Sequence, residues 1–583
     1  MPQYERRKTP GFMPDADPIS KNILLDVDLF YPIKKGVKTF PGLIAITPAL
    51  PSASLGGFVG ENGGGGPVIV AGTETDLFIL EAGQWVAQGL KSGPLAPPDR
   101  WRFTQYGLDI IAVNGVNPPY VCHNGTKFVP LGGNPPISSI AAGTDFSLFL
   151  IEAGTDTWFS SLSDAIWDLD IATETVSASL SSTPGPITAA WAIRGGMALY
   201  KRSALYAAQF EGPPFFWKFT RISNVIGTPI HECVVPAGDV HYFWGEDNFY
   251  RFDGFNLVAI PSMLREFFEA DLDKTYDYLM WGEWDEDRSL VIWHYPSVNA
   301  VPRGTLDRFL CLNTENGEWG KGHVAIPGTI VNDGVPMTYD EFGSLTQTYN
   351  SVSEATYDDP FFAGTPGSTT QGTLTIEAPM TGLFTISQGL TYDEFGRLYG
   401  QYNLIPDIAY NSVVPFGASG PLLIGAFLTD HKLYAFEGPP VMDSSFTTGD
   451  FGDRYHMFQV TRLRPGFALN PGYGWSQVEV FTQYLQGTTP ELAETVPMSP
   501  DGFMNCTVTD RLLRFKITVF AGATNNPDGG ITYAQFETLF GIYNEIPNIA
   551  YNAPLFGSPG TVNTAGNAEL ADYAIEFSEA GEV

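Results

Sequence analysis

Four closely spaced carboxylates are the strongest candidates for chemistry in this sequence. Glu283, Asp285, Glu286 and Asp287 lie in the segment WGEWDEDRSL. Two carboxyl groups can act as the acid and base of glycoside cleavage, but they must flank the bond that is cleaved. These four lie in one predicted turn between two strands, not on different elements that face each other. The pattern therefore favours a solvated turn over a catalytic pair.

Residue types that bind metals are scattered. No HxH, HExxH or CxxC motif occurs, so no zinc site is expected. Asp340 with Glu341, and Asp393 with Glu394, offer carboxylates for calcium but lack EF-hand spacing. Widely spaced cysteines favour buried free thiols over disulfides, and isolated histidines in strands are expected to be packed or on the surface. The cysteines are Cys122, Cys233, Cys311 and Cys506, and the histidines are His123, His231, His241, His294, His323, His431 and His456.

Common catalytic motifs are also missing from the sequence. There is no GxSxG elbow and no P-loop, and no GxGxxG stands between a strand and a helix. The run Gly63–Gly66 lacks the helix start of a phosphate cradle and is interpreted as a turn. LNTENGEW (312–319) resembles the Asp-box hairpin of sialidases, but Glu315 replaces its Asp. We therefore predict no catalytic, cofactor-binding or metal-binding residue, no cofactor, and no enzymatic activity.

The architecture is indicated by seven short hairpin signatures, in which apolar residues lead into a polar turn with a glycine. Their spacings are roughly 40, 30, 60, 40, 60 and 120 residues, and about 40 residues make one four-stranded propeller blade. The spacings of roughly 30 and 60 residues average to about one blade each, and the spacing of roughly 120 residues is one blade plus an insertion. We predict an all-β chain with a β-propeller of about seven blades. The glycines are Gly83, Gly125, Gly154, Gly212, Gly254, Gly317 and Gly438.

Composition agrees with many short strands joined by turns. Hydrophobic residues make up 44% of the 583 residues and aromatic residues 14%, with 63 Gly and 45 Pro. The net charge is −33, which argues against general nucleic-acid binding because phosphate contacts require clustered Lys and Arg. The first residues lack the apolar segment of a signal peptide, and no stretch is long and apolar enough for a membrane helix. The sequence predicts a protein made in a reducing cytoplasm.

A second repeat begins at about residue 337. MTYDEFGSLTQTYNSVSEATYDDPFF (337–362), LTYDEFGRLYGQYNLIPDIAYNSVVPFG (390–417) and ITYAQFETLFGIYNEIPNIAYNAPLFG (531–557) share the offsets of their Thr and Tyr residues. Asp and Asn can close local turns while Tyr rings pack beside them. We expect three superposable modules in which three tyrosines of the second copy correspond to three of the third. The pairs are Tyr392 with Tyr533, Tyr402 with Tyr543, and Tyr410 with Tyr551.

These patterns divide the chain into five parts. An N-terminal arm is expected to join a terminal sheet, and an insertion is expected to separate the last propeller blade from the others. The segment MLREFFEADLDKTYDYLM (263–280) is the best candidate for a helix between blades. The parts are 1–42, the arm; 43–336, propeller blades; 337–417, inserted repeat modules; 418–450, the last blade; and 451–583, a C-terminal β domain with a third module at 531–557.

The arm, the blade hairpins and a late strand pair together resemble the tail hub or nozzle proteins of short-tailed bacteriophages. The arm contains NILLDVDLFYPIKKGVKTFPGL, and the strand pair contains DRLLRFKITVFAG. The resemblance implies a structural virion protein that forms a homohexameric ring around the DNA ejection channel. It implies an upstream tail adaptor and tail fibre or tailspike proteins as partners, with DNA passing non-specifically. The location would be the virion tail, assembled in the host cytoplasm.

A glycan-binding or glycan-cleaving β-propeller is the alternative. Abundant aromatic side chains could stack on sugars, but no constellation of carboxylates or arginines supports cleavage. Imaging would distinguish the two, since a hub forms a ring with a central hole and a glycosidase does not need one.

Overall fold

The computed structural model describes residues 3–582 with gaps, and the gaps fall mostly in the second half of the chain. The gaps are 64–65, 91–94, 96–98, 145–146, 162–174, 213–214, 302, 324–382, 387–421, 427–429, 439, 441, 454, 470–475, 484–487, 500 and 521–567. The predicted modules at 337–362, 390–417 and 531–557 lie outside the described residues, as do Asp340, Glu341, Asp393 and Glu394.

The described chain forms a β-propeller with an additional β domain, as the sequence predicts. Five blades are separate antiparallel sheets of four strands, and the sixth is the first part of a larger sheet. Blade 1 is β6 (Gly57–Glu61), β7 (Pro67–Gly72), β8 (Leu77–Glu81) and β9 (Gln84–Ala87); blade 2 is β10 (Arg102–Tyr106), β11 (Asp109–Val113), β12 (Tyr120–His123) and β13 (Phe128–Pro130); blade 3 is β14 (Ser138–Gly143), β15 (Leu148–Glu152), β16 (Thr157–Ser161) and β17 (Thr175–Ser179).

The next three blades follow along the chain in the same strand order, so neighbouring strands in the sequence are neighbours in each sheet. Blade 4 is β18 (Ile187–Ile193), β19 (Gly196–Lys201), β20 (Ala204–Gly212) and β21 (Phe216–Ser223); blade 5 is β22 (Val235–Ala237), β23 (Val240–Trp244), β24 (Phe249–Phe252) and β25 (Leu257–Ala259); blade 6 is β26 (Trp281–Asp285), β27 (Leu290–Tyr295), β28 (Arg308–Asn313) and β29 (Trp319–His323).

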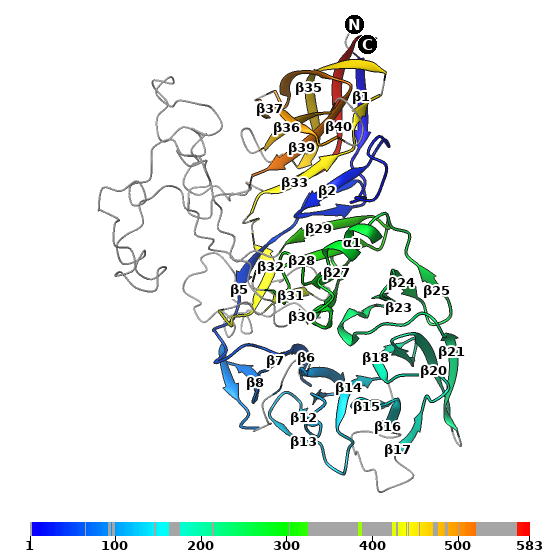
Figure 1. Cartoon of the computed structure of the whole chain (residues 1–583). Helices are drawn as coiled ribbons and strands as arrows, with labels where there is room; N and C mark the ends of the chain where they lie inside the picture. The colour runs from blue at the N-terminus through cyan, green and yellow to red at the C-terminus, as the bar shows by residue number, and fades with distance from the viewer. Residues whose placement is uncertain are drawn as a thin grey trace, which may run out of the picture.

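The seventh blade combines strands from distant parts of the chain. β30 (Leu383–Ile386) pairs with β31 (Leu422–Ala426), which contacts β32 (Tyr434–Gly438). The fourth strand is β5 (Gly42–Ala45), which pairs with β32 from the N-terminal side of blade 1. β30 also contacts the inner strands β6 and β26. The ring is therefore closed by an N-terminal strand laid on the last blade (Figure 1).

Glycines with positive φ form the outer hairpins of the blades. Gly83, Gly125, Gly212, Gly254 and Gly317 lie after the third strand of their blades, with φ from 70° to 92°. This left-handed region is readily accessible to glycine. Gly154 lies instead between the second and third strands, β15 and β16, one hairpin early. That shift explains why the spacing around it is roughly 30 and then 60 residues rather than about 40 on each side.

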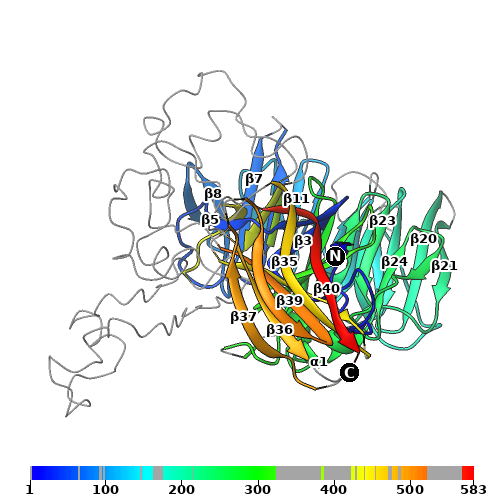
Figure 2. The ribbon, with the colours of Figure 1, turned by 90° about the horizontal axis from the view of Figure 1, so that it is seen from above.

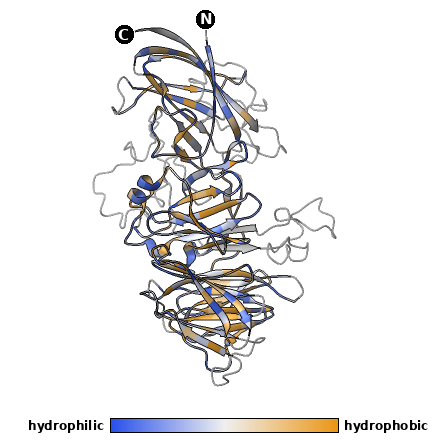
Figure 3. Cartoon of the chain, turned by 90° about the vertical axis from the view of Figure 1, so that its right-hand side faces the viewer, coloured by the Kyte–Doolittle hydropathy of each residue, from blue (hydrophilic) through white to orange (hydrophobic). Residues whose placement is uncertain are grey.

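Apolar side chains fill the spaces between neighbouring blades. One cluster joins Phe149 and Trp158 of blade 3 to Leu199 and Trp217 of blade 4, and similar clusters lie between the other described blades. Figure 3 shows apolar residues concentrated along the blade strands. The tryptophan after a hairpin glycine is expected to begin the return strand and to be buried, and Trp158 and Trp319 are buried. Trp85 is only partly buried, because it lies on the outermost strand of blade 1, where one face meets solvent.

The C-terminal β domain consists of two packed antiparallel sheets. Side chains of both sheets, such as Leu463 and Ile575 of one and Val480 and Ile517 of the other, belong to one buried cluster. The first sheet holds β1 (Gln3–Lys8), β40 (Glu569–Glu582), β35 (His456–Leu469) and β38 (Met504–Asp510); the second holds β2 (Leu24–Asp28), β33 (Ser444–Thr448), β34 (Phe451–Gly452), β39 (Leu512–Val519), β36 (Ser476–Gln483) and β37 (Glu491–Pro497).

One continuous sheet connects this domain to the propeller. β29 of blade 6 pairs with β3 (Phe30–Ile33), which pairs with β4 (Gly36–Thr39), which in turn pairs with β40. The resulting sheet has ten strands. The domain lies over one side of the ring, with blades 4 and 5 extending beyond it (Figure 2), and both termini are at its far end (Figure 1).

The structure moves three predicted boundaries. Residues 444–448, assigned to the last blade within 418–450, form β33 of the C-terminal domain because Phe446 packs on Phe30 of the arm. β30 lies inside the predicted insertion 337–417 but belongs to blade 7. The arm predicted as 1–42 leads directly into β5 (Gly42–Ala45), which belongs to blade 7. The predicted helix at 263–280 is shorter, with α1 at Arg265–Asp271 and a single helical turn, η2, at Asp277–Leu279.

Candidate functional site

A pocket on the axis of the propeller is the best candidate for a functional site. It has a volume of about 300 Å³. Its walls come from β6, β10, β18, β22 and β26, and from the helical turn η1 (His231–Cys233). The inner strands of five blades therefore meet at one cavity, which is where a propeller brings distant segments together.

An ion pair crosses the pocket floor. Nε of Arg102 donates to Oε1 of Glu232 at 2.6 Å, and Nη2 donates to Oε2 at 3.3 Å. Arg102 lies on β10 of blade 2 and Glu232 just before blade 5, on roughly opposite sides of a seven-bladed ring. The remaining Nη1 donates to the carbonyl oxygen of Ser139 in blade 3 at 2.9 Å. This bidentate contact holds three blades together across the axis.

A second arginine stabilises the same carboxylate. Nε of Arg100 lies 3.7 Å from Oε1 of Glu232, and its Nη2 donates to the carbonyl oxygen of Tyr278 at 2.7 Å. Burial alone would raise the pKa of Glu232, but the charges of Arg102 and Arg100 outweigh burial and hold that pKa at about 2. Glu232 therefore carries its negative charge throughout the physiological range.

His231 adds a neutral ring to the pocket wall. Its imidazole stacks on the indole of Trp191, with ring centroids 4.7 Å apart and planes 7° from parallel. Burial is the main cause that lowers the pKa of His231 to about 3. The ring is consequently uncharged at neutral pH and offers an aromatic face rather than a cation.

Tryptophan and phenylalanine side chains form much of the remaining wall. Trp191, Trp281 and Trp284 are partly buried and line the cavity, together with Phe58 and Phe103. The Arg100 guanidinium lies 5.8 Å from the ring centre of Trp281. Flat apolar surfaces beside hydrogen-bonding edges are typical of small-molecule sites.

The acidic segment predicted as a solvated turn divides between solvent and pocket. Glu286 and Asp287 are exposed, whereas Asp285 is buried and accepts a 2.6 Å bond from Nη1 of Arg288. Glu283 lines the axial pocket. The prediction of a solvated turn is thus right for Glu286 and Asp287 and wrong for Glu283 and Asp285, because both of these lie in β26.

The pocket holds two carboxylates from different parts of the chain. Glu232 and Glu283 line it from different elements, which is the arrangement that glycoside cleavage requires. Glu232, however, is engaged by Arg102, and its low pKa prevents it from donating a proton at neutral pH. Among the described residues, no group of three or more His, Cys, Asp or Glu side chains could hold a metal ion.

The four cysteines are buried and free, as the sequence predicts. Burial raises the pKa of Cys122 to about 11 and that of Cys506 to about 12, so these thiols stay protonated at neutral pH. A protonated thiol is a poor nucleophile. They therefore pack the core and offer no reactive site.

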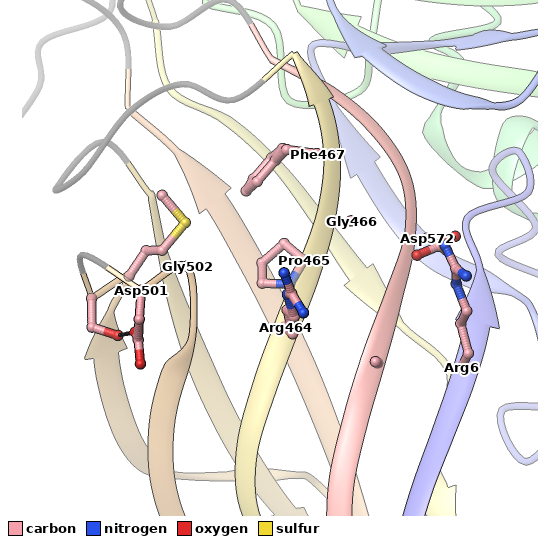
Figure 4. Close-up of a pocket in the computed structure, with 11 residues that line it drawn as sticks. Arg6, Arg464, Pro465, Gly466, Phe467, Asp501, Gly502 and Asp572 are labelled. Atoms are coloured by element: carbon pink, nitrogen blue, oxygen red, sulfur yellow. Dashed lines mark hydrogen bonds and ion pairs between the residues drawn. The ribbon is translucent and has the colours of Figure 1, made fainter.

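A second hollow lies in the C-terminal domain, with a volume of about 590 Å³. Figure 4 shows Arg6 of β1 beside Asp572 of β40, and these form an ion pair of 2.5 Å. Arg464 of β35 packs on the ring of Phe503, with a centroid distance of 5.1 Å. Pro465, Gly466, Gly502 and Ala574 supply much of the rest of the wall. This hollow is also polar, with Ser499 and Asp501 in its lining, but its walls come from one domain, whereas the axial pocket gathers the inner strands of five blades.

Three buried histidines make the propeller sensitive to acid, and His294 provides the cleanest test. Burial lowers its pKa to about 3, below the value of about 6.5 for an unfolded histidine. Between these values only the unfolded chain binds the proton, so stability falls as pH falls. We expect His294→Phe to lessen the loss of unfolding free energy between pH 7 and 4.5 by about 2–3 kcal/mol, measured by urea denaturation.

The neighbouring Phe309 provides the control for this prediction. Its ring centroid lies 5.7 Å from that of His294. Phe309→Leu should destabilise the chain equally at both pH values because neither side chain titrates. An unchanged pH dependence in His294→Phe would contradict the assignment of a neutral, buried imidazole.

Comparisons with known proteins bear on the fold alone. Neither the family models nor the curated proteins give a match. Among solved structures, virginiamycin B lyase from Staphylococcus aureus is 10% identical with a TM-score of 0.30, covering 50% of this chain and 96% of its own. BamB from Moraxella catarrhalis is 9% identical with a TM-score of 0.28, covering 50% and 84%. The Pan2 WD40 domain from Neurospora crassa is 9% identical with a TM-score of 0.29, covering 50% and 86%.

Proposed function

We propose that this chain is a structural, ring-forming component of a short-tailed phage tail, of the hub or nozzle type. The proposal begins from the resemblance of the arm, the blade hairpins and the late strand pair to those proteins. Residues 24–39 of the arm form β2, β3 and β4, which connect the propeller to the C-terminal domain. A segment that holds two domains in one rigid unit suits a protomer of a large assembly.

The bond between Arg102 and Glu232 bears on where a DNA channel could lie in such an assembly. This bond is 2.6 Å long and spans the propeller axis, where a cavity of about 300 Å³ remains. No duplex could pass along the axis of one chain. A DNA channel would therefore be built between copies of the chain, with the propeller acting as a wall block.

The charge of the chain is compatible with such a channel. With 64 acidic and 31 basic residues the chain carries a net negative charge, which would repel phosphate where acidic residues line the channel, whereas each additional Lys or Arg contact would retain DNA. In this proposal the copies form a homohexamer, an upstream adaptor docks on one end, and fibre or tailspike proteins attach at the side. Among the described residues, no helix is long and apolar enough to cross a membrane.

Electron microscopy of the purified full-length chain tests the proposal. We expect rings with sixfold symmetry and a central hole wider than a DNA duplex. The chain is imaged alone and together with a tail adaptor, so that assembly on an adaptor template is also tested. A chain that stays monomeric under both conditions would overturn the ring-forming function.

In this proposal the repeat modules act as contacts or gates between copies. Deleting all of 337–417 would also remove β30, the strand of blade 7 that contacts β6, so the test needs a narrower deletion. A deletion limited to 391–417 keeps β30 and β31. It should leave thermal unfolding unchanged and abolish ring formation in the same images.

A further inference from the structure

The lining of the axial pocket is unusual for space inside a folded domain. Trp191 of blade 4, with Trp281 and Trp284 of blade 6, lines a cavity instead of being fully buried in the core. Partly buried indoles leave apolar faces in contact with water, which is unfavourable. A bound molecule with a flat apolar face would cover them.

The charges of the pocket are nearly balanced. Arg102 is paired with Glu232, the Arg100 guanidinium lies behind them, and Glu283 contributes another carboxylate to the lining. His231 is neutral because burial lowers its pKa to about 3. The lining holds one guanidinium group and two carboxylates, and the Arg100 guanidinium, 3.7 Å from Glu232, brings the local charge to about zero. An uncharged ligand fits this balance best.

We propose that the axial pocket binds a neutral hexopyranose, either free or as the terminal residue of a glycan. The C–H groups of a pyranose ring would pack on the negative face of an indole. Its hydroxyls would donate to carboxylate oxygens and accept from guanidinium N–H groups at the rim of the ring. Three partly buried tryptophans and a balanced set of polar side chains provide both kinds of contact.

The size of the cavity limits the ligand. A volume of about 300 Å³ is at the lower end of the range for small-molecule sites, roughly 300–1,000 Å³. One or two sugar residues fit, and a long chain would have to enter by its end. Cleavage is not part of this proposal, because Glu232 is held as an ion-paired carboxylate.

A cation such as choline is the main competing ligand, since it also binds to aromatic cages. The pocket opposes it, because Arg102 lies in the lining and the Arg100 guanidinium occupies a position 5.8 Å from the ring centre of Trp281. An anion is opposed in the same way by Glu232 and Glu283. The uncharged ligand meets neither form of repulsion.

Saturation-transfer NMR with the full-length chain tests the proposal. The probes are the methyl glycosides of glucose, galactose and mannose, together with choline chloride and sodium glucuronate. We expect transfer to the ring C–H protons of at least one neutral glycoside, and none to choline. Stronger transfer to choline or glucuronate, or no transfer to any glycoside, would overturn the proposal.

Two variants locate the site. Trp281→Leu removes a stacking face and should weaken binding of the responding glycoside tenfold or more in calorimetry. Glu283→Gln keeps the shape of the side chain and should weaken binding of the same glycoside several-fold. This variant still tests the site if Trp281→Leu fails to fold. Trp85→Phe, on the outer strand of blade 1, is the matched control and should bind as the parent does. Equal binding by all three variants would place the sugar elsewhere and refute the proposal.

This inference does not depend on the tail function. A monomer that binds a sugar in the axial pocket would contradict the ring proposal and leave the sugar site standing. A ring that binds none of the glycosides would contradict the sugar site and leave the ring proposal standing.

Discussion

Glu232→Ala should lower the free energy of unfolding by about 3–5 kcal/mol, the usual result of removing one partner of a buried ion pair. Glu232 is 5% exposed and accepts two bonds from Arg102. Its loss removes the carboxylate that pairs with Arg100, which is buried, and with Arg102, which is partly buried. Each keeps only one bond to a backbone carbonyl, to Ser139 and Tyr278 respectively. The variant is measured by urea denaturation at pH 7.

The pH dependence of this difference has a definite sign. The pKa of Glu232 is about 2 in the folded chain and about 4.3 when unfolded. The ion pair therefore stabilises the fold fully above pH 4.3, and its contribution decreases as pH falls toward 2. We expect the difference between parent and variant to be constant from pH 5 to 8 and to shrink below pH 4.

An exposed ion pair provides the control. Glu246 pairs with Arg202 at the surface, where the two side chains are 37% and 70% exposed, and such pairs contribute about 0–1 kcal/mol. Glu246→Ala should therefore differ little from the parent. If Glu232→Ala were equally mild, the pair across the axis would not hold the blades together.

The sequence predicts the propeller because its blades are local structures. Most outer hairpins have a glycine with positive φ beside a run of strand-forming residues, and both lie within about 40 residues of chain. Gly83, Gly212 and Gly317 mark their blades directly. The position of Gly154, one hairpin early, made the spacings on either side of it irregular. Local signals of this kind are readable without knowledge of the fold.

The closure of the ring and the axial pocket could not be predicted in this way. β5 and β32 are separated by almost 400 residues of chain, yet they pair, with Ala45 opposite Tyr434. Nothing in the sequence of either segment identifies the other as its partner. Arg102 and Glu232 are 130 residues apart and belong to no motif. In the sequence, Trp191, Trp281 and Trp284 cannot be distinguished from core residues, because only the tertiary structure brings them to a common cavity.

Deletion of residues 1–46 should abolish the cooperative unfolding of the whole chain. The deletion removes β1 to β5, which pair with β40, β33, β29 and β32 in both domains. It also removes Phe12, Leu24, Phe30 and Val37, each at most 1% exposed. Burying four such side chains contributes roughly 6–12 kcal/mol, which is comparable with the roughly 5–15 kcal/mol stability of a typical protein.

The truncated chain should thus lack a sharp thermal transition in circular dichroism and be cut rapidly by protease in both domains. The deletion of 391–417, which spares every described strand, is the matched control and should melt as the parent does. Because β5 closes blade 7 while β3 and β4 join blade 6 to β40, losing the arm opens the ring and separates the domains at once. A truncated chain that melts at the parental temperature would show that the two domains are stable without the arm.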